Sequence, residues 1–383
     1  MRVYLDNAAT TMTDPKAVKA MIPYFSEKYG NASSIHQFGK EAKKAVGRSR
    51  SFIAARINAN PSEIIFTSGG TESDNLALRG VAHANRHLGN HIITSKIEHP
   101  AILNTCNSLM EEGFEVTMID VDQEGLIDLN ALEKAIRKKT VLVSVMHANN
   151  EIGTIQPIEK IGKICKKRRI LFHSDAVQSF TKVPIDVKRM NIDLLSLSSH
   201  KIHGPKGIGA LFVRKGVKIR EELTGGQHES GLRAGTQNVP GIVGFGRAVE
   251  AARDGDAKRM AKLRDRLISE LLRIKGSKLN GAKGDKRLCN NVNVGFRGVE
   301  GESLMMYLDT KGIASSTGSA CSNLLIKEGG VSHVLQAVCK DMEFASGSIR
   351  LTLSRFSTRE EIDYAVKSVN EVVEHLRKIS GFK

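Results

Sequence analysis

Short apolar runs alternate with amphipathic segments between residues 63 and 215. The runs have the length of buried strands and occupy residues 63–68, 91–95, 115–120, 140–147, 170–175, 193–198 and 209–213. Between several of them, apolar positions recur with helical spacing, at residues 72–87, 99–113 and 158–169. This alternation predicts an α/β domain built on a mostly parallel sheet.

The pattern changes after about residue 250. An amphipathic helix is expected at 257–274, a strand at 291–296, a helix at 302–309 and an alternating strand at 348–355. The capping sequence "STREE" then precedes the last helix. This texture is typical of an α+β domain. We therefore predict a large domain over residues 15–252 and a smaller one formed by residues 1–14 and 253–383.

Composition restricts the class of protein. No apolar run of the 383-residue chain approaches the ~20 residues of a membrane-spanning helix, and the amino terminus lacks a secretory signal pattern. We expect a cytoplasmic protein without membrane contact. The net charge of +16 comes from basic residues spread over helices and not interleaved with aromatics, which favours a solvated basic surface over direct nucleic acid binding.

The five cysteines are scattered and show no CxxC spacing, which argues against disulfides and against a zinc site. Four lie among apolar neighbours and are expected to be buried thiols: Cys106, Cys165, Cys289 and Cys339. Cys321 lies in the small, polar stretch "SSTGSACSN" and is expected to be exposed.

Chemistry-bearing residues follow several predicted strands, where parallel α/β sheets bind their ligands. A small-residue loop precedes a helix that starts near Thr71, and the free amides of such a helix suit a phosphate, although its glycines also suit a plain turn. His99, Asn150, Asp175 and Gln178 follow other strands. Together they predict one site at this edge of the sheet.

Lys201 directly follows the strand at 193–198 and raises a choice between two interpretations. Because a buried acid needs a cation, Asp175 and Lys201 could form a structural ion pair. Alternatively, Asp175 pairs with a protonated pyridine nitrogen while Lys201 holds an aldehyde as a Schiff base, as pyridoxal phosphate enzymes require. The second interpretation explains more residues, because the phosphate, the ring face and the phenolic oxygen also need contacts. Those contacts would come from Thr71, Ser198, His200, His99 and Gln178.

Ten motifs in order carry a resemblance over essentially the whole chain: "YLDNAATT", "YGNASSIH", "TSGGTESDN", "IEHPA", "HANNEIGTIQP", "HSDAVQ", "SSHKIHGPKGIGAL", "LRAGTQN", "STGSACS" and "SIRLTLSRF". Together they resemble the pyridoxal phosphate cysteine desulfurases of the NifS/IscS type, in the class V aminotransferase family. The resemblance implies an α/β, fold-type I, aminotransferase-like architecture. It also implies a homodimer in which each subunit completes the other's site.

The resemblance also assigns roles by position. Lys201 matches the Schiff-base lysine, Asp175 the partner of the pyridine nitrogen, and His99 the histidine that stacks on the ring and acts as acid or base. Cys321 matches the nucleophile. The phosphate contacts match Gly70, Thr71, Ser198 and His200, with Thr236 reaching the neighbouring subunit's phosphate. Asn150 and Arg350 match the groups that hold the substrate carboxylate, for which a guanidinium is well suited.

The implied reaction converts L-cysteine to L-alanine and leaves the sulfur as a persulfide on Cys321. The persulfide would supply iron–sulfur cluster assembly through a scaffold protein, with tRNA thiolation as a further use. No resident metal is expected, although Cys321 could transiently ligate an iron–sulfur cluster with the scaffold. Alternatives are a selenocysteine lyase, another fold-type I enzyme such as an aminotransferase, or a basic RNA-binding or scaffold protein with a degenerate enzyme fold.

Three positions depart from the family pattern. The segment after Cys321 is a few residues longer than expected, Ser230 stands where arginine is common, and Cys339 stands where glycine is expected. A thiol is reactive only in an exposed, electropositive site, so we interpret Cys339 as a buried thiol and not as a second sulfur relay.

Overall fold

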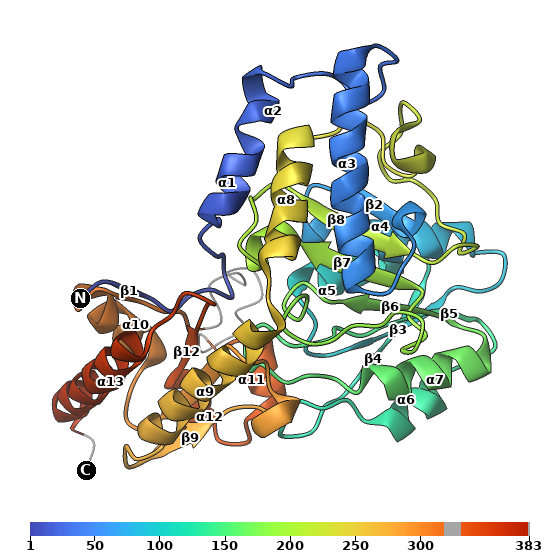
Figure 1. Cartoon of the computed structure of the whole chain (residues 1–383). Helices are drawn as coiled ribbons and strands as arrows, with labels where there is room; N and C mark the ends of the chain where they lie inside the picture. The colour runs from blue at the N-terminus through green and yellow to red at the C-terminus, as the bar shows by residue number, and fades with distance from the viewer. Residues whose placement is uncertain (318–330, 382–383) are drawn as a thin grey trace.

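The computed structural model describes residues 1–317 and 331–381 and is built around a seven-stranded sheet (Figure 1). In order across the sheet, the strands are β2 (Ile64–Thr67), β8 (Gly209–Val213), β7 (Leu194–Ser198), β6 (Leu171–Asp175), β5 (Thr140–Ser144), β3 (His91–Ser95) and β4 (Glu115–Ile119). Neighbouring strands pair in parallel except at β8, which is antiparallel to both β7 and β2. The predicted mostly parallel α/β sheet is confirmed.

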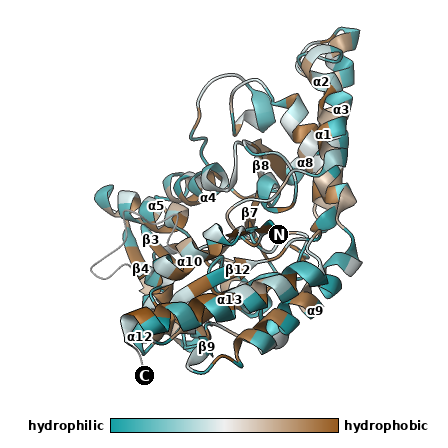
Figure 2. Ribbon diagram, turned by 90° about the vertical axis from the view of Figure 1, so that its left-hand side faces the viewer, coloured by the Kyte–Doolittle hydropathy of each residue, from teal (hydrophilic) through white to brown (hydrophobic). Residues whose placement is uncertain are grey.

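Helices cover both faces of this sheet (Figures 1 and 2). One face carries α4 (Gly70–Ala84) and α5 (Pro100–Glu111), and the other carries α3 (Gln37–Arg56), α6 (Leu129–Ala135), α7 (Ile158–Arg168) and α8 (Val239–Ala251). Successive residues of one strand serve different cores, because Ile92 packs with the first group and Ile93 with the second. A strand buried on both faces carries apolar residues toward both, which explains the nearly continuous apolar runs in the sequence.

A second apolar core joins the two ends of the chain. Val3 and Leu5 pack there with residues of the carboxyl-terminal elements, among them Leu267 and Ile349. Its elements are β1 (Val3–Tyr4) paired with β11 (Ile313–Ala314), the sheet β12 (Ser348–Thr352), β10 (Asn291–Phe296) and β9 (Ser277–Leu279), and the helices α9 (Asp254–Leu271), α10 (Gly301–Thr310) and α13 (Arg359–Ser380). The proposed domain limits at 14/15 and 252/253 stay a prediction.

The remaining helices lie beside these two cores. α1 (Pro15–Met21) and α2 (Pro23–Ser26) run along α8, and α11 (His333–Val338) is followed by α12 (Met342–Ser346) (Figure 1). Among the helices of the described part of the chain, none has both the length and the apolar character that crossing a bilayer requires.

Four thiols are buried, as the sequence predicts: Cys106, Cys165, Cys289 and Cys339. The Cys339 thiol donates to Asn280 Oδ1 at 3.3 Å, and burial raises its pKa. A buried thiol with a raised pKa is a poor nucleophile, which fits the interpretation of Cys339 as a structural residue.

Candidate active site

A cavity of about 260 Å³ lies at the carboxyl ends of β6 and β7. Asp175 is the last residue of β6 and Ser198 the last of β7, and the two strands are parallel neighbours, so their ends meet. The structure brings these two residues together in the cavity lining with Gly70, Thr71, His99, Asn150, Gln178, His200, Lys201 and Arg350. Most of the residues that the sequence predicts for one site therefore line a single cavity at this edge of the sheet.

Two residues named from the sequence are not in this lining. Thr236 is exposed, in the segment that leads into α8. Cys321, the expected nucleophile and the residue that could meet a scaffold's cluster, lies outside the described residues. Among the residues that are described, no group of three or more His, Cys, Asp or Glu side chains could hold a metal ion.

Lys201 lies in a short 3₁₀ turn, η2 (Ser199–Lys201), directly after β7. Its Nζ donates to the carbonyl oxygens of Ala8 and Ala9, at 2.5 and 2.7 Å. The amino-terminal segment is tied to the same turn, because Thr11 donates from its amide and its hydroxyl to the His200 carbonyl. Two carbonyl acceptors thus hold the lysine ammonium inside the cavity.

Asp175 and Asp74 are two carboxyls in one buried region. Burial raises the pKa of Asp175, while the Val177 amide, which donates to it at 2.8 Å, and the nearby Lys201 oppose that rise. Burial, and then the charge of Asp175, raises the pKa of Asp74 well above its usual range. Two adjacent buried carboxyls do not both ionise without a cation. The site therefore favours one carboxylate that faces a positive group.

His99 caps the amino terminus of α5. Its Nδ1 accepts a hydrogen bond from the Ala101 amide at 3.1 Å, so the neutral ring carries its proton on Nε2. Burial, followed by the charges of Lys201 and His333, lowers the pKa of His99 to about 4. At neutral pH the ring is therefore uncharged, which suits contact with the face of a flat aromatic group.

Unused hydrogen-bonding groups lie among the residues that line the cavity. Among the described residues, the buried Ser198 hydroxyl has no hydrogen-bond partner, and the amino terminus of α4 has no side-chain cap from Gly69. At Gly70, a Cβ atom would lie only 2.8 Å from Val177 Cγ2, so a larger residue would displace its neighbour. A helix amino terminus with spare donors is a ready anion site, and these residues fit a phosphate group.

Arg350 also lines the cavity. Its side chain is buried, with Nη2 donating to Asp6 Oδ1 at 2.8 Å and Nη1 to the Asn150 carbonyl at 3.2 Å. Its Nε has no partner among the described residues. A guanidinium held in this way is suited to a substrate carboxylate.

Sequence reasoning did not single out three acids that shape the site. Asp74 lies four residues after Gly70 on α4, and this helical spacing is the signal that could have found it. Asp6 orients Arg350. Glu98 is buried and accepts hydrogen bonds from the Met146 amide and the Ser95 hydroxyl, and burial raises its pKa to about 8.

Two contacts tie the start of α11 to the loops that carry His99 and Asn150. Ser332, the residue before α11, donates from its hydroxyl to Glu151 Oε2 at 2.6 Å. His333 Nε2 contacts the Glu98 carbonyl at 3.0 Å. Burial raises the pKa of Glu151 to about 7. The described residues resume at 331, so this end of α11 lies beside the loops that carry His99 and Asn150.

Comparison with known proteins settles the family. The model of the aminotransferase class-V family matches residues 3–365. The chain belongs to this family. It is 52% identical over 381 residues to a cysteine desulfurase IscS of Methanosarcina thermophila, which covers 99% of this chain and 93% of the relative. It is 49% identical over 384 residues to the mitochondrial cysteine desulfurase of Saccharomyces cerevisiae, covering 99% of this chain and 76% of the relative.

Solved structures of related proteins agree. A NifS-like protein superposes with a TM-score of 0.91 at 42% identity, covering 98% of this chain and all of the other. A structure described as SspA in complex with cysteine superposes with a TM-score of 0.83 at 38% identity, covering 93% and 100%. The resemblance to NifS/IscS-type proteins and the fold-type I, aminotransferase-like architecture are confirmed for this class-V family member.

Proposed function

We propose that this chain is a pyridoxal phosphate-dependent cysteine desulfurase, which converts L-cysteine to L-alanine and collects the sulfur on Cys321. The observation that carries the proposal is the convergence of Lys201, Asp175 and His99 in one cavity that Arg350 borders. Family members named cysteine desulfurases support the choice of substrate.

The residues of the cavity fit pyridoxal phosphate. When bound, this cofactor supplies an electron sink that stabilises negative charge at the α-carbon of an amino acid. Lys201 would hold its aldehyde, Asp175 its ring nitrogen, and Gln178 its phenolic oxygen. The spare donors at Gly70, Thr71, Ser198 and His200 would hold its phosphate, and the uncharged His99 ring would cover its face.

The chain's own residues then account for the chemistry of the substrate. Arg350 and Asn150 hold the carboxylate, and the amine of Lys201 accepts the α-proton. The Cys321 thiolate attacks the substrate sulfur, so that a sulfur–sulfur bond forms while the bond from sulfur to the β-carbon breaks. The electron pair of that bond stays on carbon, which takes up a proton to become the methyl group of alanine.

We also propose that the chain forms a homodimer and passes its sulfur to a partner protein. The side chains of Ile22, Phe25, Ile35 and Phe38 expose apolar surface around α1, α2 and the start of α3. Such a patch suits burial against a second copy of the chain. In a homodimer Thr236, exposed in the single chain, would reach the partner's phosphate site. The sulfur would pass to an iron–sulfur scaffold protein, and a cytoplasmic location stays a prediction.

The test is exposure of the purified protein to L-cysteine, followed by mass spectrometry of the peptide that contains Cys321 and by an alanine assay. One added sulfur on Cys321, with alanine formed, is expected. Lys201→Ala should yield neither product. Cys321→Ser should keep the cofactor's colour and its change on adding L-cysteine, yet form no persulfide.

Other outcomes would point to the alternative functions. Alanine formed from selenocysteine but not from cysteine would indicate a selenocysteine lyase. Transfer of the amino group to a keto acid would indicate an aminotransferase. A colourless protein that takes up no pyridoxal phosphate would favour the RNA-binding or scaffold protein.

A further inference from the structure

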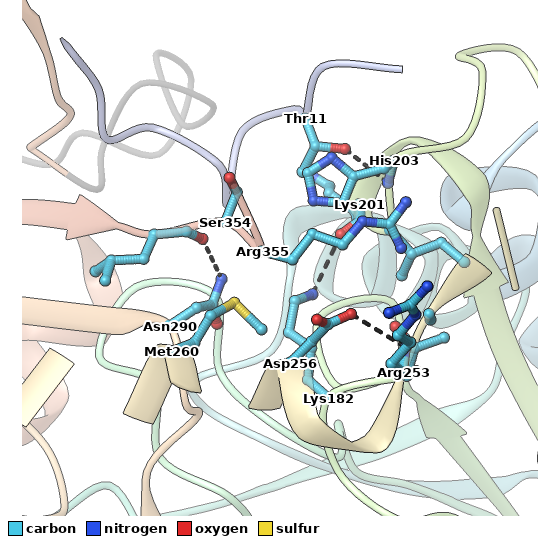
Figure 3. Close-up of a pocket in the computed structure, with 14 residues that line it drawn as sticks. Thr11, Lys182, Lys201, His203, Arg253, Asp256, Met260, Asn290, Ser354 and Arg355 are labelled. Carbon is cyan, nitrogen blue, oxygen red and sulfur yellow. Dashed lines mark hydrogen bonds between the residues drawn. The ribbon is translucent and has the colours of Figure 1, made fainter. Parts of the chain in front are cut away.

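Lys182 lines a second cavity together with Lys201, which also lines the cavity of the candidate active site (Figure 3). It follows Thr181, whose φ of 64° lies in the left-handed region that non-glycine residues seldom adopt. The Lys182 Nζ donates to the carbonyl oxygen of Gln178 at 2.8 Å and to that of Lys201 at 3.2 Å. One side chain therefore bonds the main chain of two cavity residues.

These two carbonyls belong to different turns. The parallel pairing of β6 with β7 ends at Asp175 and Ser196. After this pair, each strand leads into its own turn. Gln178 is in the turn after β6, and Lys201 is in the turn after β7. Beyond the last strand pair, Lys182 joins the turns that place the two side chains in the cavity.

The surroundings of Lys182 argue against a plain packing role. Burial lowers its pKa to about 8, so placing this amine here is unfavourable unless polar groups compensate. It borders a cavity of about 30 Å³, which has room for about two waters. Asn290 lines the same cavity, and its Oδ1 has no hydrogen-bond partner among the described residues. Lys182 forms no ion pair with any described carboxylate, so the two carbonyls are its evident compensation.

We propose that Lys182 is a positioning residue for the cofactor. By holding the Gln178 and Lys201 carbonyls, it fixes the spacing between the side chain that meets the ring's phenolic oxygen and the lysine that meets its aldehyde. This inference rests on the proposed function, because it assumes that pyridoxal phosphate occupies the cavity.

The test compares three variants by titrating cofactor-free protein with pyridoxal phosphate and following its visible absorbance. Lys182→Met keeps the length and apolar stem but removes the donors, and it should weaken cofactor affinity about 10-fold, since a hydrogen bond from a charged group is lost at each carbonyl. Lys182→Arg keeps donors and should recover most of that loss. Lys188→Met is the matched control. Lys188 is exposed, its side-chain amine donates only to Asn58 Oδ1 among the described residues, and the variant should bind like the wild type.

Visible circular dichroism of the bound cofactor gives a second readout, since it reports how rigidly the ring is oriented. We expect a smaller signal per bound cofactor in Lys182→Met and an unchanged signal in Lys188→Met. A merely structural role would lower the melting temperature of the cofactor-free protein while leaving affinity and dichroism intact, and that result would overturn the inference.

Two further outcomes separate this inference from the proposed function. Wild-type protein that takes up no pyridoxal phosphate overturns both. Wild-type binding with unaltered binding by Lys182→Met overturns the positioning role alone. If Lys182→Met does not fold, Lys182→Gln serves instead: its shorter amide cannot bridge both carbonyls, and wild-type affinity and dichroism in that variant would equally overturn the role.

Discussion

Arg350 is held between Asp6 and the main chain of Asn150, so that its guanidinium plane is fixed before a substrate arrives. We predict that Arg350→Lys raises the KM for L-cysteine about 10-fold or more and leaves cofactor affinity nearly unchanged. A lysine keeps the charge but cannot offer two parallel donors to a carboxylate. Steady-state kinetics and cofactor titration measure the two effects.

The matched control is Arg355→Lys. Arg355 also pairs with an acid of the amino-terminal segment, Asp14, but it does not line the proposed cofactor cavity. Its KM for L-cysteine should stay close to that of the wild type. An unchanged KM in Arg350→Lys would remove Arg350 from substrate binding.

Glu98 gives a pH-dependent prediction at the same scale. Burial raises its pKa from 4.5 to about 8, so between these values the folded chain binds a proton that the unfolded chain lacks. Its contribution to stability is fully present below about pH 4.5 and is lost as pH rises to about 8. Glu98→Gln has no carboxyl at this position, so its stability does not fall with pH in this way. Its melting temperature relative to the wild type should therefore rise by about 5 °C between pH 5 and pH 8.

The comparison is made on cofactor-free protein, with Glu115→Gln as its control. Glu115 is only partly buried on β4, and a hydrogen bond from Lys139 lowers its pKa. Both its folded and its unfolded pKa lie below the tested range, so its melting difference should stay flat. A flat difference in Glu98→Gln as well would mean that Glu98 is not protonated in the folded chain.

At the scale of elements, the start of α11 depends on Ser332. Its hydroxyl accepts from the Leu335 amide at 3.1 Å and donates to the buried Glu151. Ser332→Ala loses a helix cap and leaves that acid without its donor, so it should lower the free energy of unfolding by about 1–3 kcal/mol. Ser332→Thr keeps the hydroxyl and should lose less. Urea denaturation measures both.

Ser269→Ala provides the baseline for that experiment. Ser269 is exposed on α9 and donates only to the Arg266 carbonyl of its own helix among the described residues. Its loss should change stability by less than about 0.5 kcal/mol. Equal effects at Ser332 and Ser269 would show that the link to Glu151 contributes nothing measurable.

Strand positions were predictable because strands buried on both faces form nearly continuous apolar runs, but such runs do not show the direction of the strand. The run at 209–213 therefore gave no sign that β8 is antiparallel. The length of the connecting segment could have indicated the antiparallel direction, because β7 ends at Ser198 and β8 begins at Gly209. The intervening segment is too short for a parallel crossover with a helix, which takes a dozen or more residues.

At the scale of the whole molecule, the exposed apolar side chains around α2 predict self-association. Phe25 is 65% exposed, and Ile22 lies close to it in sequence. The double variant Ile22→Asp/Phe25→Asp should sediment as a monomer, because charges cannot be buried against a second copy. It should also hold pyridoxal phosphate less tightly, since the partner's Thr236 would no longer reach the phosphate.

Met306→Asp controls for the added charge. Met306 is 66% exposed but lies on α10, away from α1 and α2 (Figure 1). This variant should sediment like the wild type and keep its cofactor. A double variant at Ile22 and Phe25 that remains dimeric would place the subunit contact elsewhere.

The sequence located the cavity only in part. Strand ends bring Asp175, Ser198 and Lys201 together by rule, since neighbouring parallel strands end at one edge. The pairing of Asp6 with Arg350 joins residues 344 positions apart, and no local pattern encodes it. Lys182 was missed for a similar reason: its partners are main-chain oxygens, which any sequence supplies.

That long-range pairing has a consequence for protein synthesis. Arg350 is synthesised 344 residues after Asp6, about 20–70 s later at ordinary rates of elongation. A nascent chain that already exposes Lys201 therefore lacks the arginine that would orient a substrate. Between the synthesis of Lys201 and that of Arg350, the growing chain has the lysine but lacks the arginine, so it gains the ability to hold a substrate carboxylate only after Arg350 has been made.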